Sequence, residues 1–191
     1  MSEKKKIYVA VTQTGTILSR IVKWVTRDKY NHVSISLTKD LSDLYSFGRK
    51  NPYNPFRAGF VKESPTSGTF GRFYKTEAVI VELEVEGEVY DELSRELSEM
   101  YENRDKYKYN YIGLFAGFFG KTYRRDNIFY CSEFVQYILK KHGLGLRKGD
   151  RELVCPNDFV NLQGGKIIYT GRIRAYGEAL TEKAEETKNE E

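Results

Sequence analysis

The sequence is poor in the residues that build cross-linked or metal-bound scaffolds. Its 191 residues include two cysteines and two histidines, and two cysteines do not make a disulfide framework. The zinc-binding spacings Cys-x-x-Cys and His-Glu-x-x-His are missing. The glycine-rich stretch from Gly113 to Gly117 lacks the lysine spacing of a phosphate-binding loop. We therefore expect neither a metal nor a cofactor.

Long apolar runs are also missing. Residues 111–119 are all apolar or glycine, but this run is too short to span a bilayer, so no transmembrane segment is expected. The N-terminal Met-Ser-Glu-Lys-Lys-Lys runs directly into a strand-like segment and has no signal-peptide pattern. Because a reducing compartment preserves unpaired thiols, we expect a cytoplasmic location. The net charge of +4 is modest and no motif for base readout occurs, so no nucleic-acid partner is expected.

The residues that are present suit one folded domain. A chain of 191 residues with 40% hydrophobic side chains can fill a single core. The last segment is acidic and poor in apolar residues, which is typical of a solvated helix or a disordered tail. We predict a domain over residues 1–177 and a flexible tail over 178–191. The oligomeric state is left open.

The most informative segment surrounds Cys131. Residues 128–130 indicate extended backbone, whereas the apolar side chains at 134, 135, 138 and 139 recur with helical spacing. Gly143 then offers a left-handed helix stop. Cys131 is therefore expected in the first turn of a buried helix. Free amide groups and the positive end of the helix dipole lie there, and both favour a thiolate over a thiol.

His32 is the histidine best placed to act as the base for this thiol. The run from 31 to 37 alternates like a strand, with Val33, Ile35 and Leu37 on one face. His32 shares the other face with two serines, whose small side chains allow another element to approach closely. His142 lies about three turns further along the cysteine helix, so it cannot reach Cys131.

A cysteine and a histidine in these positions predict nucleophilic catalysis, in which the imidazole takes the thiol proton. We expect Cys131 sulfur and a His32 nitrogen within about 4 Å of each other. Each residue also has a structural interpretation: a lone cysteine is often a small core residue, and a lone strand histidine is often simply hydrogen-bonded. We interpret Cys155, which precedes a proline in a loop, as structural.

The order of these segments carries a family resemblance. A histidine at a strand start is followed by a long insertion and then by Tyr-Cys-Ser-Glu-Phe-Val at 130–135. Pro-Asn-Asp-Phe follows at 156–159 and Ile-Ile-Tyr-Thr-Gly at 167–171. This order resembles the circularly permuted NlpC-type branch of papain-like cysteine hydrolases, whose core is shared by lecithin retinol acyltransferase-like enzymes. The resemblance covers about residues 6–177 and implies a thiol hydrolase or acyl-transfer fold without naming a substrate.

The resemblance also implies roles for three residues. Cys131 matches the nucleophile and His32 matches the base. The third polar residue of the family orients the imidazole from the next strand, here Leu44–Gly48, and the matching position is Ser46. A serine can accept one hydrogen bond from the ring, but it cannot stabilise an imidazolium by charge. An ordinary strand hydroxyl is the alternative interpretation of Ser46.

Hydrophobic periodicity predicts most of the remaining elements. Residues 49–73 hold three of the four prolines and are predicted to be a long irregular connection that either borders a substrate cleft or only covers the sheet. The other expected strands are 6–12, 43–48, 76–85 and 167–171, and the other expected helices follow Thr14-Gly-Thr16 and span 87–106.

The apolar segment 111–119 has two interpretations. We prefer core packing beside the cysteine helix, in which case Phe115→Ala would lower stability by about 3–5 kcal/mol. The alternative is a wall that binds acyl chains, because ligand pockets are lined mainly by apolar and aromatic groups.

Together these patterns predict an α+β domain, a permuted papain-like fold in which a small antiparallel sheet carries the Cys131 helix. The expected activity is hydrolysis of a peptide-like amide bond through a thioester on Cys131, with His32 as base. One alternative is a lipid acyl hydrolase or acyltransferase on the same fold. The other is a catalytically weak binding module, which the serine at position 46 favours.

Overall fold

The computed structural model describes most of the chain, including the three predicted site residues Cys131, His32 and Ser46. No described helix is both long enough and apolar enough to span a membrane. The helix expected after Thr14-Gly-Thr16 and most of the acidic tail lie outside the described residues. Those residues are 3–15, 28–51, 53–54, 56–118, 120–121, 123, 125–146 and 154–180.

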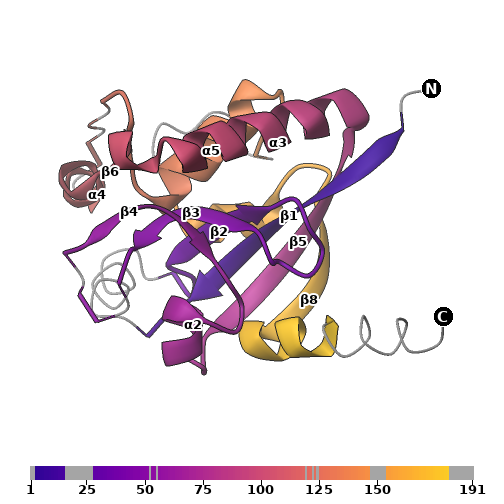
Figure 1. The fold of residues 1–191 in the computed structure, drawn as a ribbon, viewed down its shortest axis with the longest axis horizontal. Helices are drawn as coiled ribbons and strands as arrows, with labels where there is room; N and C mark the ends of the chain where they lie inside the picture. The colour runs from indigo at the N-terminus through magenta and orange to yellow at the C-terminus, as the bar shows by residue number, and fades with distance from the viewer. Residues whose placement is uncertain are drawn as a thin grey trace.

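One eight-stranded sheet organises the fold (Figure 1). Its strand order is β7-β6-β4-β3-β2-β1-β5-β8, and all neighbours are antiparallel except β6 and β7. The α+β class is confirmed, but the sheet is larger than predicted because β4, β6 and β7 continue it beyond β3. The strands are β1 (Lys4–Gln13), β2 (His32–Ser36), β3 (Leu44–Arg49), β4 (Ala58–Glu63), β5 (Glu77–Glu86), β6 (Lys108–Tyr109), β7 (Ile128–Phe129) and β8 (Lys166–Arg172).

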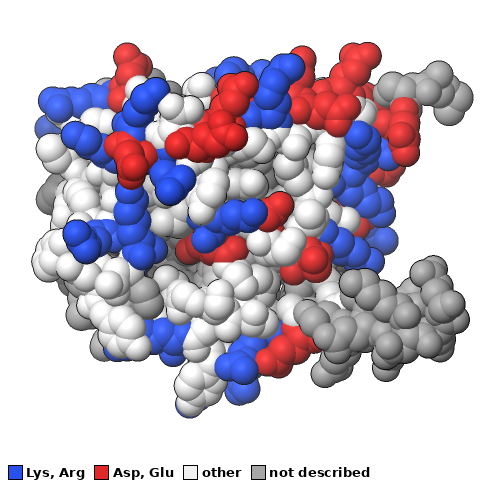
Figure 2. Space-filling model, viewed as in Figure 1, with Lys and Arg blue, Asp and Glu red and all other residues white. Residues whose placement is uncertain are grey.

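Helices cover both faces of the sheet (Figure 1), and basic and acidic side chains are intermixed on the surface seen from the same side (Figure 2). Helices α3 and α5 pack on one face, whereas α2 and the helical residues 173–180 pack on the other. Residues 178–180, which we assigned to the tail, therefore continue a helix that packs on the domain. The bounds are α2 (Gly68–Arg72), α3 (Gly87–Glu102), η1 (Arg104–Lys106), α4 (Tyr111–Phe118), α5 (Cys131–Lys141) and η2 (Pro156–Asn161).

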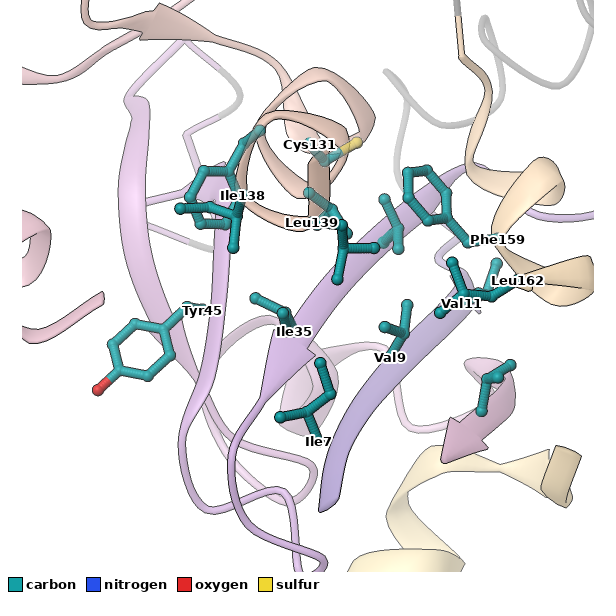
Figure 3. Close-up of a cluster of buried hydrophobic side chains, with 14 of the residues drawn as sticks. Ile7, Val9, Val11, Ile35, Tyr45, Cys131, Ile138, Leu139, Phe159 and Leu162 are labelled. Atoms are coloured by element: carbon teal, nitrogen blue, oxygen red, sulfur yellow. The ribbon is translucent and has the colours of Figure 1, made fainter. Parts of the chain in front are cut away.

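Strand alternation creates two separate apolar cores. Successive side chains of a strand point to opposite faces, so Ile7, Val9 and Val11 of β1 join the core under α3 and α5 (Figure 3). Tyr8 and Ala10 join the smaller core that α2 and residues 173–180 cover. The sheet is thus buried on both sides near its middle.

Helix α5 is held by the apolar stripe that its sequence predicts. Phe134, Val135, Ile138 and Leu139 are buried against β2 and β3, including the Val33 and Ile35 face of β2. Each such side chain contributes about 1.5–3 kcal/mol by leaving water. The helix ends at Lys141, and Gly143 follows with φ of +72°, a left-handed conformation that glycine adopts at low cost.

The prediction of an irregular connection over 49–73 is wrong in part. Residues 58–63 form β4, which pairs with β3 along its whole length. Phe60 is almost fully buried, and its ring centroid lies 5.4 Å from that of Phe47. Pro55 and Pro65 flank this short strand in the sequence and Gly59 lies inside it, and these residues masked its pattern. The predicted helix over 87–106 also divides, because α3 ends at Glu102.

The core interpretation of segment 111–119 does not fit α4. Ile112 is 60% exposed and Phe115 is 49% exposed. Leu114 instead lies in the wall of a cavity that also contains Cys131. An apolar run that faces solvent is unusual and often marks a surface that binds something. Phe115→Ala is therefore expected to cost far less than a buried aromatic would.

Candidate active site

Cys131 occupies the first residue of α5, as predicted. Tyr130 before it is extended, with φ of −104° and ψ of 172°. The Cys131 side chain is buried, with 6% of the residue exposed. Amide groups in the first turn of a helix have no carbonyl four residues earlier within that helix. Their partial positive charge therefore lies beside the sulfur.

A buried acid fixes this helix start. Glu133 Oε2 lies 3.3 Å from the donating Tyr130 N–H and 3.2 Å from Asn110 Nδ2. Asn110 also donates to the Tyr123 carbonyl at 2.8 Å and accepts from Gly113 N–H at 2.7 Å, in the first turn of α4. The starts of α4 and α5 are thus joined through one buried amide side chain.

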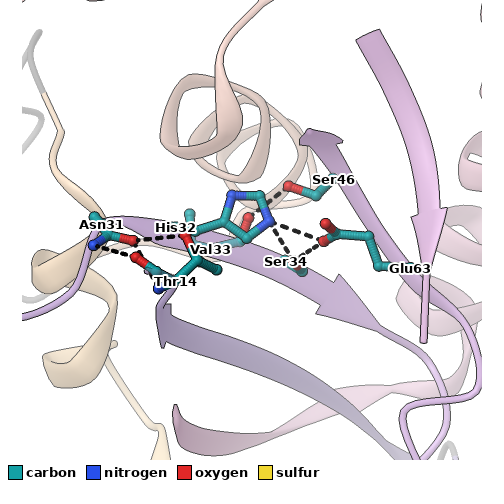
Figure 4. A network of polar contacts seen from close by, with 7 residues as sticks. All are labelled: Thr14, Asn31, His32, Val33, Ser34, Ser46 and Glu63. Atoms are coloured by element: carbon teal, nitrogen blue, oxygen red, sulfur yellow. Dashed lines mark hydrogen bonds and ion pairs between the residues drawn. The ribbon is translucent and has the colours of Figure 1, made fainter. Parts of the chain in front are cut away.

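His32 lies at the start of β2, where one ring nitrogen meets a carboxylate (Figure 4). His32 Nε2 is 2.9 Å from Glu63 Oε2, and both side chains are mostly buried. Ser34 Oγ donates to the same carboxylate oxygen at 2.8 Å and lies 3.3 Å from His32 Nε2. On the histidine face Ser34 therefore contacts the Glu63 side chain of β4, a strand of the same sheet, whereas α5 packs on the opposite face of β2 with Val33 and Ile35.

The side chains of His32 and Glu63 meet across β3, which lies between β2 and β4. Gly48 of β3 makes this possible. A Cβ at Gly48 would lie 3.1 Å from Glu63 Oε1, 3.3 Å from Val61 Cγ2 and 3.5 Å from His32 Cε1. Because glycine has no side chain, the space above β3 is left for the ring and the carboxylate.

Ser46 does not hold the imidazole in the way we predicted. Its hydroxyl donates to the Val33 carbonyl at 2.7 Å, and the residue is fully buried. The β2–β3 ladder pairs Ile35 with Tyr45 but does not continue to Val33, so the serine hydroxyl satisfies a carbonyl that a backbone amide would otherwise bind. Glu63 takes the orienting position instead.

Cys131 and His32 meet in a small cavity of about 60 Å³. Both residues line it, and a hydrogen bond with the Cys131 side chain is one of the interactions that raise the pKa of His32. Since Nε2 is engaged by Glu63, Nδ1 is the ring nitrogen that faces the thiol. The structure therefore brings the two predicted residues together, whereas their catalytic roles stay predictions.

The charges of the site favour an ionised histidine. Burial lowers the pKa of His32, but the charge of Glu63 and the hydrogen bonds with Cys131 and Glu63 raise it further, to about 10. Burial raises the pKa of Glu63, while the charge and hydrogen bond of His32 and the hydrogen bond of Ser34 lower it to below its usual value. At neutral pH the pair is therefore an imidazolium and a carboxylate.

Tyr109 lines the same cavity. Burial and the charge at Cys131 raise the pKa of Tyr109 well above its ordinary value. The phenol therefore keeps its proton at all physiological pH values and can donate a hydrogen bond into the cavity.

The remaining candidates have structural surroundings. His142 caps the end of α5, where its Nε2 lies 2.9 Å from Glu96 of α3. No disulfide joins Cys131 to Cys155, and Cys155 N–H donates to Asp158 at the start of η2. Among the described residues, no group of three or more histidine, cysteine or acidic side chains is placed to hold a metal.

Glu63 is the residue that sequence reasoning missed. It lies at the end of a six-residue strand that we interpreted as loop, and it is 31 positions from His32. One signal was present: Phe60 and Val61 precede a lysine and Glu63, as in a short strand that ends in charged residues. That pattern predicts a strand, but it does not predict which strand of the sheet lies beside it.

Sequence comparisons leave the site without a family assignment. No protein-family model matches the chain, and a search of curated proteins gives no significant match. The functional argument therefore stands on the geometry around Cys131.

Proposed function

We propose that the chain is a cysteine hydrolase with a permuted papain-like core, which cleaves peptide-like amide bonds through a thioester on Cys131. One observation carries the proposal. Cys131, at the start of α5, contacts His32, and the other nitrogen of His32 pairs with Glu63. A nucleophile, a base and a group that orients the base are the parts that this chemistry needs.

The first half of the reaction forms the thioester. The Cys131 proton has already passed to His32, so the reaction starts from a thiolate beside the imidazolium, and the Cys131 sulfur attacks the carbonyl carbon of the substrate. The carbonyl oxygen becomes an oxyanion, which the Cys131 backbone N–H stabilises together with a hydrogen bond from Tyr109. When the carbon–nitrogen bond breaks, His32 gives its proton to the departing amine.

The second half releases the acid. His32, now neutral, takes a proton from water, and the water oxygen attacks the thioester carbon. The carbon–sulfur bond breaks, so Cys131 leaves as a thiolate beside the protonated His32. Glu63 holds the ring in one orientation and stabilises its positive charge, which a serine could not do.

Acetylation by p-nitrophenyl acetate tests the proposal. We expect a burst of nitrophenolate and an acetyl group on Cys131, found by intact mass and peptide mapping of acid-quenched protein. Cys131→Ser should abolish the burst, whereas Cys155→Ser should retain it. Acetylation of both cysteines at equal rates, or of neither, would contradict an activated nucleophile and would leave the fold as a binding module.

A second candidate function is hydrolysis or transfer of lipid acyl groups. The exposure of Ile112 and Phe115 on α4 favours it, because Leu114 of the same helix reaches the cavity wall. Apolar side chains on the exposed surface of α4 and in the cavity wall suit an acyl chain better than a polar peptide. The chemistry at Cys131 would be the same with an ester oxygen as the leaving atom.

A chain-length series separates the two candidates. With p-nitrophenyl acetate, butyrate and octanoate, a lipid enzyme should show kcat/KM rising with each added pair of methylenes, and Phe115→Ala should flatten that rise. An amide hydrolase should show no rise, and Phe115→Ala should then leave the series unchanged. Thermal unfolding of Phe115→Ala provides the control for folding.

A further inference from the structure

Arg49 differs from the other cations near the site because its guanidinium has no acidic partner among the described residues. The Nη2 atom of Arg49 is buried and has no hydrogen-bond partner among those residues. Lys62 pairs with Asp43, and Lys50 lies 3.5 Å from Asp105. A buried donor without a partner is destabilising, and more so when the group is charged. Among the described residues the Thr12 hydroxyl is also buried without a partner, but Arg49 is the charged one of the two, and it lines the same cavity as the candidate nucleophile.

Arg49 stands where a substrate would extend beyond Cys131. It is the last residue of β3, and it lines both the cavity of Cys131 and His32 and an adjoining hollow of about 340 Å³. Glu63 also borders both spaces, but it is already bound by His32 and Ser34. The guanidinium is therefore the charged group at this junction that is available to a ligand.

Two tyrosines and an arginine are the groups whose charges act on the pKa of Arg49. Burial lowers the pKa of Arg49, the hydroxyls of Tyr109 and Tyr111 raise it, and the positive charge of Arg72 lowers it. An arginine side chain stays charged in proteins nonetheless. Arg72 lies 4.1 Å from the centre of the Tyr53 ring, so a second guanidinium is held near Arg49 by an aromatic contact. An anion at the junction would satisfy both its hydrogen-bond donors and its charge.

We propose that Arg49 binds an anionic oxygen group, a carboxylate or a phosphate, which the substrate carries beside its scissile carbonyl. The planar guanidinium presents several donors in a fork that fits two oxygens of one such group. This proposal rests on the proposed function, because it treats Cys131 as the nucleophile that the substrate must reach. It narrows the substrate class to acyl compounds with a negative charge close to the reacting carbon.

Two alkylating agents that differ only in charge test the proposal. Iodoacetate carries a carboxylate where iodoacetamide carries a neutral amide. The rate of Cys131 alkylation by iodoacetate divided by the rate with iodoacetamide therefore reports an anion-binding group. The same ratio at Cys155 in the same sample corrects for intrinsic reactivity. We expect the corrected ratio to fall about tenfold or more in Arg49→Gln, since a charge-assisted hydrogen bond contributes that much. Arg49→Lys should retain part of it.

Arg95→Gln is the matched control. Arg95 is exposed on α3 and lines neither cavity, so the same loss of charge there should leave the ratio unchanged. An equal fall in both variants, or no fall in Arg49→Gln, would overturn the proposal. Circular dichroism of each variant shows whether it is folded. If Arg49→Gln does not fold, Arg49→Lys replaces it in the comparison with Arg95→Gln.

Protection of Cys131 from labelling by different anions shows whether Arg49 prefers a carboxylate or a phosphate. Sodium phosphate and N-acetylglycine are each titrated against iodoacetamide labelling of Cys131, and the anion that protects at the lower concentration identifies the class. Loss of that protection in Arg49→Gln supports the proposal, and retention contradicts it. Failure of the proposed function looks different: Cys131 would then react no faster than Cys155 with either reagent.

Discussion

Helix α5 has a histidine–glutamate pair near each end. The nitrogen–oxygen distance is the same in the two pairs, but their surroundings differ. His32 meets Glu63 beside Cys131 at the start of the helix, and His142 meets Glu96 at its end. Both contacts join Nε2 to a carboxylate oxygen at 2.9 Å, and all four side chains are mostly buried. A short contact between a histidine and an acid therefore does not identify an active site.

The two pairs differ in what the second ring nitrogen of the histidine faces and in which other group contacts the carboxylate. His142 Nδ1 is 3.4 Å from Glu92, and Glu96 is shared with Lys141 at 2.8 Å. That arrangement crosslinks α5 to α3. The second nitrogen of His32 faces a thiol in a cavity, and Glu63 is supported by a neutral serine. A pair becomes chemically useful when one of its groups still faces an open space.

Removing each histidine in turn should give the largest contrast. We expect His32→Ala to slow alkylation of Cys131 by iodoacetamide about 100-fold at pH 6, because a thiol with an ordinary pKa of about 8.5 is under about 1% ionised there. His142→Ala should change the rate less than about twofold, since it lies at the far end of the helix. Stopped-flow or quenched labelling with peptide mass analysis measures both rates. Similar rates in the two variants would contradict the assignment of His32.

Removing the two acids should separate the pairs by stability. Glu63→Gln leaves an imidazole without its buried counter-charge, and breaking such a pair is destabilising by about 3–5 kcal/mol. Glu96→Gln should be destabilising by about 1–2 kcal/mol, because Lys141 is half exposed and can be solvated, and His142 Nδ1 keeps Glu92 at 3.4 Å. Urea unfolding followed by fluorescence gives both free energies. A larger decrease in the free energy of unfolding for Glu96→Gln than for Glu63→Gln would contradict the proposed roles.

The stability of the first pair should depend on pH in a defined window. Folding raises the pKa of His32 from 6.5 to about 10, so its contribution is complete below about pH 6.5 and is lost as the pH rises toward 10. Folding lowers the pKa of Glu63, so its contribution is present above about pH 4.5 and is lost at lower pH. The unfolding free energy of the native chain minus that of His32→Gln should therefore fall between pH 6.5 and 10. A flat difference would show that the ring is not ionised in the folded chain.

The smallest effect is expected where glycine leaves room for the pair. Gly48→Ala would place a methyl group against Glu63, Val61 and His32, and crowding of this kind is destabilising by about 1–3 kcal/mol. It should also slow Cys131 alkylation. Gly145→Ala is the control, because no atom lies within 4 Å of its added Cβ, and it should stay within about 0.5 kcal/mol of the native chain. Equal stability of the two variants would mean that the ring and carboxylate can separate freely.

Local patterns predicted the parts of the site that depend on one element at a time. Helical spacing after Cys131 gave the start and buried stripe of α5, and strand alternation gave the face that His32 shares with Ser34. Glu63 could not be found this way, because its role depends on β4 lying beside β3 and on a glycine between them. A family pattern pointed to Ser46 on the adjacent strand, but the carboxylate arrives from one strand further away.

The exposure of α4 was unpredictable for a related reason. An uninterrupted apolar run carries no periodicity, so the sequence does not say which side is covered. Asn110 anchors this helix to the start of α5 through polar contacts, which no hydropathy pattern records. The prediction of core packing assumed that apolar residues seek the interior, and that rule holds in one direction only.

The site also draws on both sides of the sheet. Cys131 belongs to the core beneath α3 and α5, whereas the His32 ring packs 6.3 Å from Phe70 in the core on the opposite face. A chain that has formed only one of these layers has only one member of the proposed pair in place. The reactivity proposed for Cys131 therefore depends on completion of both layers of the fold.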